Sequence, residues 1–249
     1  MSRVGRLRAA SRAAALSFLR RRTAVFFTFL FPLLIVLIFG ALIETGAGGG
    51  GLFAEPPGYY VPGYLAVVVL FTPLSRVGSE VARHREGNRF EKLATTPLRR
   101  WEWLFAQTLV NVAVIGLAAL LLLALLVAVT GAEIVLSPLL IPFVVVGVAL
   151  FCGIGALIGA LADSQDGVIA TSNAIALPLL FLSETFAPPS LLPAWFRPAL
   201  ELSPLTYFSR GVRAATFDST GDPLPNLAIL VGLAALALAI GALALPRTD

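Results

Sequence analysis

Residues 80–103, EVARHREGNRFEKLATTPLRRWEW, carry charged side chains that could support chemistry. They include the only lysine of the chain, Lys92, and its only histidine, His84. A GxxxxGK[ST] phosphate loop needs a lysine directly after a glycine, but Lys92 follows Glu91. An intramembrane serine protease would need a serine and a histidine inside membrane-spanning segments, and a zinc protease would need HExxH; the lone His84 fits neither. The stretch therefore indicates a docking surface rather than a catalytic site.

The sequence also gives no basis for redox chemistry or for a metal site. Cys152 is the only cysteine and falls inside an apolar run, which excludes an internal disulfide and a thiolate metal cluster. A buried packing role suits it better. We predict no catalytic residue, no bound cofactor and no metal site on this chain.

The composition indicates the elements that must position the charged stretch. The 249 residues are 58% hydrophobic and 13% charged, against about 25% charged in an average soluble domain. We expect an all-α polytopic membrane protein in which residues 1–249 form a single transmembrane domain. The length leaves room for six spans and short loops, without a further soluble domain of ordinary size.

Six apolar runs approach or exceed the roughly 20 residues that cross a bilayer. The predicted spans are Ala24–Ile43, Tyr59–Gly78, Trp103–Thr130, Leu139–Ala162, Val168–Phe186 and Leu227–Leu245. Ion-coupled carriers often place a charged residue near the middle of a span, and these spans have none there. A carrier is therefore disfavoured, although neutral oxygens can still bind sodium.

The orientation follows from the basic residues, which cytoplasmic flanks retain. Of the 18 lysines and arginines, all but Arg197, Arg210 and Arg213 lie before the first span, around residues 76–100 or in the tail. We therefore expect both termini and residues 80–102 to lie in the cytoplasm. The expected location of the chain is the plasma membrane. The net charge of +4 does not indicate binding to nucleic acid, because the anionic headgroups of the bilayer can balance basic residues beside the spans.

Residues 1–22 are predicted to form an interfacial helix. Val4, Leu7, Ala14 and Phe18 recur at helical spacing with arginines between them. A disordered basic anchor is the alternative.

The loop at residues 80–102 has the pattern of a short docking helix. Helix is favoured from Glu80 to Leu93, apart from Gly87 and Asn88, with Phe90 and Leu93 three apart on an apolar edge. Thr96 and Pro97 suit the N-cap and first position of the next helix. The alternative is a solvated loop that only retains positive charge.

Residues 187–216 contain five prolines among large apolar side chains. This pattern predicts two short re-entrant helices on the extracellular side, with an interfacial loop as the alternative. In the fourth span, Gly155 and Gly159 form a close-packing motif, within one chain or between two.

Two motif blocks resemble the ABC-2 type transporter permease family. FEKLATTPLRRWEW matches its signature between the second and third spans, at Glu91, Leu93, Thr96, Pro97, Leu98, Arg100 and Glu102. FLSETFAPPSLLPAWFRPALELSPLTYFSRGVR resembles the segment after the fifth span, with Phe181, Leu182, Ser183, Pro188, Leu192, Pro193, Trp195, Pro204, Leu205, Thr206, Tyr207 and Arg213 in the matching places.

The resemblance implies the transmembrane subunit of an exporter, working as two copies with a separate cytoplasmic ABC ATPase that binds ATP and Mg. The coupling residues it implies are Arg83, Arg85, Glu86, Arg89, Phe90, Glu91, Leu93, Thr96 and Pro97. Glu184, Trp195, Tyr207 and Arg213 would lie at the outer mouth. Many family members have glycine where this chain has Glu184, which would either contact substrate or pair with an arginine. An ion-coupled carrier and a membrane anchor or assembly protein remain the alternative functions.

Overall fold

The computed structural model describes residues 2–38, 55–132, 134–185, 193–217 and 221–246. They contain helices and no strand, as the sequence predicts. In chain order the helices are α1 (Arg3–Leu19), α2 (Arg22–Leu37), the 3-10 turn η3 (Pro57–Tyr60), α3 (Val61–Glu86), α4 (Arg89–Ala94), α5 (Arg100–Thr130), α6 (Leu140–Leu161), α7 (Gln165–Phe181), α8 (Arg197–Leu200), α9 (Pro204–Thr216) and α10 (Leu224–Ala244).

Four of the described helical segments are long and apolar enough to cross a membrane. They are Pro57–Glu86, Arg100–Thr130, Leu140–Leu161 and Leu224–Ala244, which match four of the predicted spans. The first predicted span corresponds to α2, which is apolar but has 16 residues, and residues 39–43 lie outside the described part. The fifth corresponds to α7, which ends at Phe181, five residues before the predicted end.

The central helix of the bundle is α3, which packs against α6 along much of its length. An added Cβ at Gly155 would lie 2.5 Å from the backbone oxygen of Leu74, and one at Gly159 would collide with the backbone of Gly78. Both glycines are therefore needed for close approach of α6 to α3. This resolves the alternatives for the glycine motif: it serves contacts within one chain.

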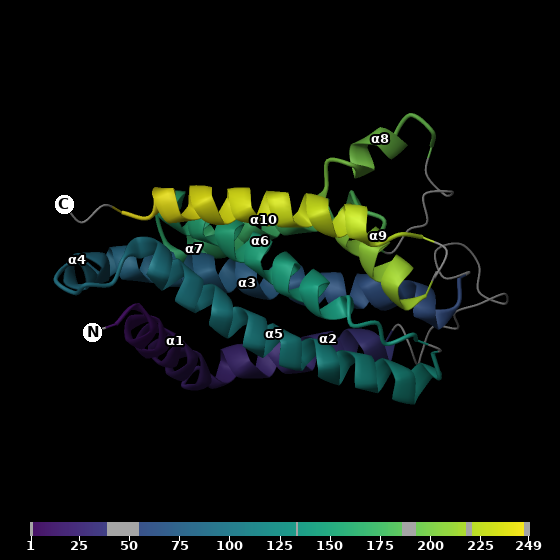
Figure 1. The fold of residues 1–249 in the computed structure, drawn as a ribbon, viewed down its shortest axis with the longest axis horizontal. Helices are drawn as coiled ribbons and strands as arrows, with labels where there is room; N and C mark the ends of the chain where they lie inside the picture. Colours follow the sequence, from purple (N-terminus) through teal and green to yellow (C-terminus); the bar gives the residue numbers. More distant parts are fainter. Residues whose placement is uncertain (1, 39–54, 133, 186–192, 218–220, 247–249) are drawn as a thin grey trace.

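Different helices lie at the two ends of the bundle (Figure 1). The helices α1 and α4 and the C-terminal end of α10 lie at one end, and α8 lies toward the other. The Arg100 guanidinium donates a 2.7 Å hydrogen bond to the backbone oxygen of Leu245, which ties the end of α10 to the start of α5. The described ends of the chain thus share one end of the bundle with the charged stretch.

Candidate functional site

The charged stretch forms a helical corner at the end of α3. α3 continues to Glu86, Gly87 caps it, and Asn88 adopts a left-handed conformation with a φ of 49°. Asparagine tolerates this conformation better than most residues, so the chain can reverse here and begin α4 at Arg89. The predicted interruption at Gly87 and Asn88 is confirmed.

The predicted start of the next helix at Thr96 and Pro97 is wrong. Thr96 instead donates from its hydroxyl to the backbone oxygen of Leu93 at 2.6 Å, which closes α4. α5 begins at Arg100, where a carboxylate oxygen of Glu102 accepts from the backbone N–H of Arg99 at 2.9 Å. The glutamate in the first turn satisfies this otherwise orphan donor, and Pro97 stays in the exposed connection.

The predicted apolar edge of α4 faces inward. Phe90 is buried, with its ring centroid 5.4 Å from that of Trp103 on α5 and 5.3 Å from that of His84 on α3. Leu93 is half-buried against the same core. Phe90 is therefore not part of an exposed docking edge; it anchors α4 to its own chain, because the rings of His84 and Trp103 enclose it.

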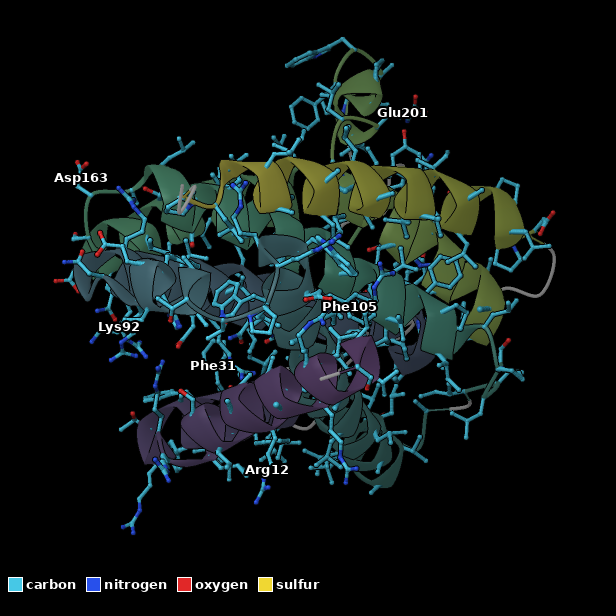
Figure 2. All side chains as sticks on the ribbon, turned by 60° about the vertical axis from the view of Figure 1, so that its left-hand side comes forward. Arg12, Phe31, Lys92, Phe105, Asp163 and Glu201 are labelled. Carbon is cyan, nitrogen blue, oxygen red and sulfur yellow. The ribbon has the colours of Figure 1, made fainter. Side chains whose placement is uncertain are left out.

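The outward surface of α4 is charged. Arg89, Glu91 and Lys92 are exposed, as are Thr96 and Pro97 just beyond the helix. Figure 2 shows Lys92 projecting at the same end of the molecule as Asp163, which follows α6. We call Arg89, Glu91 and Lys92 the α4 surface.

Three predicted coupling residues bind neighbouring helices of this chain. Arg83 donates to the side-chain oxygen of Gln165 on α7 at 3.0 Å and to Glu80 at 3.1 Å. Glu86 accepts from both the backbone and the side-chain nitrogen of Gln165 at 3.0 Å. Arg85 donates to the backbone oxygens of Gly159 and Ala162, where its charge complements the C-terminal end of the α6 dipole.

Two glutamates that the sequence did not single out as site residues join the first helices to the rest. Glu80 on α3 accepts from Arg21 at 2.8 Å. Glu102, whose side chain is fully buried, accepts from Arg6 on α1 at 2.7 and 3.2 Å. This hydrogen-bonded carboxylate raises the pKa of Arg6, so the pair stays charged. The end of α3, the start of α5 and the N-terminal helices are thus linked through side chains.

The far end of the bundle holds a second ionic cluster. Glu184 is buried and accepts from Arg210 on α9 at 2.5 and 3.0 Å, which raises the pKa of Arg210. Arg213 donates to the backbone oxygen of Glu184 at 2.8 Å and lies 4.0 Å over the Tyr59 ring, and its burial lowers its pKa. Of the two alternatives for Glu184, pairing with an arginine is therefore confirmed.

The other residues predicted at the outer mouth occupy different surroundings. The hydroxyl of Tyr207 donates to the backbone oxygen of Glu201 at 3.0 Å, and Trp195 is 80% exposed. The predicted pair of short helices after α7 is present as α8 and α9, and residues 187–192 of that segment lie outside the described part. The buried side of α9 includes Leu205, Phe208 and Val212, so α9 packs as part of the bundle.

The two ends offer ion pairs and exposed charges rather than reactive groups. In the described ranges, no three histidine, cysteine, aspartate or glutamate side chains come together as metal ligands would.

Comparison with known proteins gives the family. No curated protein matches the chain. The family model described as ABC-2 type transporter matches residues 6–217, which extend from α1 to just beyond α9 and include both motif blocks. With its apolar helices and this match over most of its length, the chain belongs to the ABC-2 type transporter family, the membrane permease components of ABC transporters.

Proposed function

We propose that this chain is the permease subunit of an exporter, and that a separate cytoplasmic ABC ATPase drives it by binding the α4 surface. The observation that carries this proposal is a short charged helix that is exposed outward and anchored inward by Phe90. The inward anchor joins α4 to both α3 and α5, so a force on α4 reaches two long helices.

The ion pairs extend this connection to the remaining helices near that end. Glu80 joins α3 to Arg21 at the start of α2, and Glu86 joins α3 to α7 through Gln165. Glu102 joins α5 to α1 through Arg6. Closure of an ATPase against α4 would therefore tilt several helices together instead of moving one loop. Packed elements of this kind transmit small displacements because they are not freely deformable.

The membrane arrangement we propose has six spans, with α2 and α7 added to the four long helices. Both termini and α4 would lie in the cytoplasm of a cell carrying the chain in its plasma membrane. The positive-inside rule supports this side for the end that holds α1 and α4, because residues 1–22 and 76–100 contain 14 of the 18 lysines and arginines. The arginine-rich α1 would rest along the inner headgroups.

At the outer end, we assign the exposed Trp195 and the half-buried Tyr207 to the export mouth. Glu184 and Arg213 would hold α9 against the turn after α7 rather than contact substrate. A second permease copy would complete the path. Exposed small residues on α7, Ala170 and Ala174, lie four apart as in close helix–helix contacts and support such a copy.

The test is reconstitution of the chain in proteoliposomes, with or without the ABC ATPase whose gene lies nearest to the gene of this chain. The chain alone is expected to hydrolyse no ATP, since ATP and Mg would bind the partner, and ATP-driven efflux of a fluorescent drug or lipid probe should require both proteins. Ethidium and fluorescently labelled phosphatidylglycerol are suitable probes. Uptake of either probe by the lone chain under a proton or sodium gradient would instead establish an ion-coupled carrier. If the ATPase does not associate at all, an anchor or assembly role would replace the proposal.

A further inference from the structure

The chain turns inward where α10 ends. Ala244 is the last residue of the helix, and Leu245 follows it with a φ of −59° and a ψ of 138°. Leu245 is 1% exposed, whereas Leu243, two residues earlier, is 74% exposed. The turn that ends α10 therefore directs Leu245 into the bundle.

The residues after α10 lie beside the inward side of α4. Leu245 belongs to the same apolar core as Phe90 and Trp103. Pro246 lines a small hollow whose other walls include Phe90 and Leu93 of α4 and Trp103 of α5. Figure 1 shows α4 and the end of α10 at the same end of the bundle. Leu245 and Pro246 thus give α4 a third neighbour, besides α3 and α5.

A hydrogen bond holds the end of α10 in place. The Arg100 guanidinium, at the start of α5, donates to the backbone oxygen of Leu245 at 2.7 Å. The last turn of α10 contains no basic residue, so this helix has no cation of its own for its C-terminal carbonyl groups. Arg100 supplies the positive charge from another helix, where it complements the dipole of α10. Because Arg100 is half-buried, water competes less for this bond than at an open surface.

Further along its length, α10 packs closely on α6. An added Cβ at Gly153 would lie 2.5 Å from the backbone carbonyl carbon of Ala237, and one at Gly241 would lie 2.5 Å from the backbone oxygen of Gly153. α10 has no charged side chain, so it takes no part in the ion pairs that join other helices. A displacement of its end would instead reach α6 through close backbone packing, which leaves little room for independent sliding.

We propose that Arg100, Leu245 and Pro246 form a clasp that joins α4 and the start of α5 to α10, and that Arg100 and Leu245 are positioning residues for energy coupling. We call these three residues the α10 clasp. A displacement of α4 passes through the clasp to α10 and from there to α6, the two long helices that the ion pairs of the proposed function do not include. The inference rests on the proposed docking of an ABC ATPase on α4, but the clasp itself is a property of this chain alone.

The first measurement needs no ATPase. Nitroxide labels are attached to cysteines that replace Lys92 on the α4 surface and Leu236, an exposed residue of α10, in the full-length chain carrying Cys152→Ala. Pulsed electron paramagnetic resonance then gives the distribution of the distance between the two labels. Arg100→Ala and Leu245→Ala, which break the clasp from opposite sides, are each expected to broaden this distribution.

Two matched variants serve as controls for the clasp. Arg100→Lys should keep the narrow distribution, because a lysine ammonium can supply the one donor that the backbone oxygen of Leu245 accepts. Leu243→Ala removes an exposed leucine of the same turn and should also leave the distribution unchanged.

The second measurement separates coupling from docking. ATP hydrolysis in proteoliposomes is followed while the concentration of the ABC ATPase is raised. The alanine variants of Arg100 and Leu245 leave the α4 surface intact, so half-maximal stimulation should need the same ATPase concentration as in wild type. Maximal stimulation should fall at least roughly fivefold, as for the loss of an allosteric coupling. Arg100→Lys should restore it.

Failure of the clasp and failure of the docking proposal give different results. A distance distribution that stays narrow in both alanine variants would refute the clasp. A broadened distribution with wild-type maximal stimulation would show that α10 does not carry the movement, and a higher ATPase concentration for half-maximal stimulation would assign Arg100 to docking instead. If the wild-type chain does not stimulate the ATPase, the docking proposal and the positioning role fail together, and the distance measurement still decides whether the clasp exists.

Discussion

Replacing Glu102 with alanine is expected to abolish most of the stimulation of ATP hydrolysis that the proposed docking of an ABC ATPase implies, while the chain remains inserted. The buried carboxylate performs two tasks, since it caps the start of α5 at Arg99 and holds Arg6 on α1. Removing it breaks the ion pair between α1 and α5. Allosteric couplings are typically worth roughly 5- to 150-fold, and we expect a loss in that range. ATP hydrolysis by the ATPase in proteoliposomes with wild-type or variant permease measures it.

Two further variants separate the tasks of Glu102. Arg6→Ala removes only the link to α1, so it should reproduce part of the loss while α5 keeps its cap. Arg8→Ala, an exposed neighbour on α1, is the matched control and should behave as wild type. If Glu102→Ala retains full stimulation, or if Arg8→Ala loses as much as Arg6→Ala, the link between α1 and α5 does not transmit the movement.

Replacing Arg210 with alanine is expected to destabilise the outer end more than other single arginine substitutions there. The Glu184 carboxylate would remain buried without its bidentate partner. Breaking a fully buried pair costs about 3–5 kcal/mol. Because the Arg210 side chain is 36% exposed, solvent screening should reduce the loss to about 2 kcal/mol. Thermal unfolding in detergent would show this as a lower midpoint.

The control for Arg210→Ala is Arg197→Ala, an exposed arginine on α8 that forms no ion pair within the described chain. It should leave the midpoint unchanged. Adding Glu184→Gln to Arg210→Ala should recover much of the loss, because the stranded charge is then removed. No recovery would mean that the arginine acts through packing rather than through the ion pair.

Local features of the fold could be predicted from the sequence because they depend on neighbouring residues. Apolar runs marked the helices, Gly87 and Asn88 marked the break before α4, and Gly155 with Gly159 marked a close helix contact. The pairing of Glu184 with an arginine was one of two stated alternatives, since a buried carboxylate needs a nearby cation.

The partners of the charged residues could not be predicted, because they lie far away along the chain. Glu80 pairs with a residue 59 positions away and Glu102 with one 96 positions away, and no local spacing identifies either partner. The error at Phe90 has a different cause: its ring partners, His84 and Trp103, are near in the sequence but lie on other helices, and local spacing does not show how those helices pack. A signal was nevertheless present: Glu80 and Glu102 are isolated acidic residues at the ends of spans where arginines predominate.

The most direct test of an ATPase bound to the α4 surface is site-specific photo-cross-linking in native membranes. A photoreactive phenylalanine analogue would replace Lys92 in one variant and Glu201 in another. Glu201 is an exposed residue near α8, well away from Lys92 (Figure 2). The expected result is an adduct with the ABC ATPase from position 92 and none from position 201. An ATPase that co-purifies with the permease but cross-links from position 201, or from neither position, would contradict docking on α4.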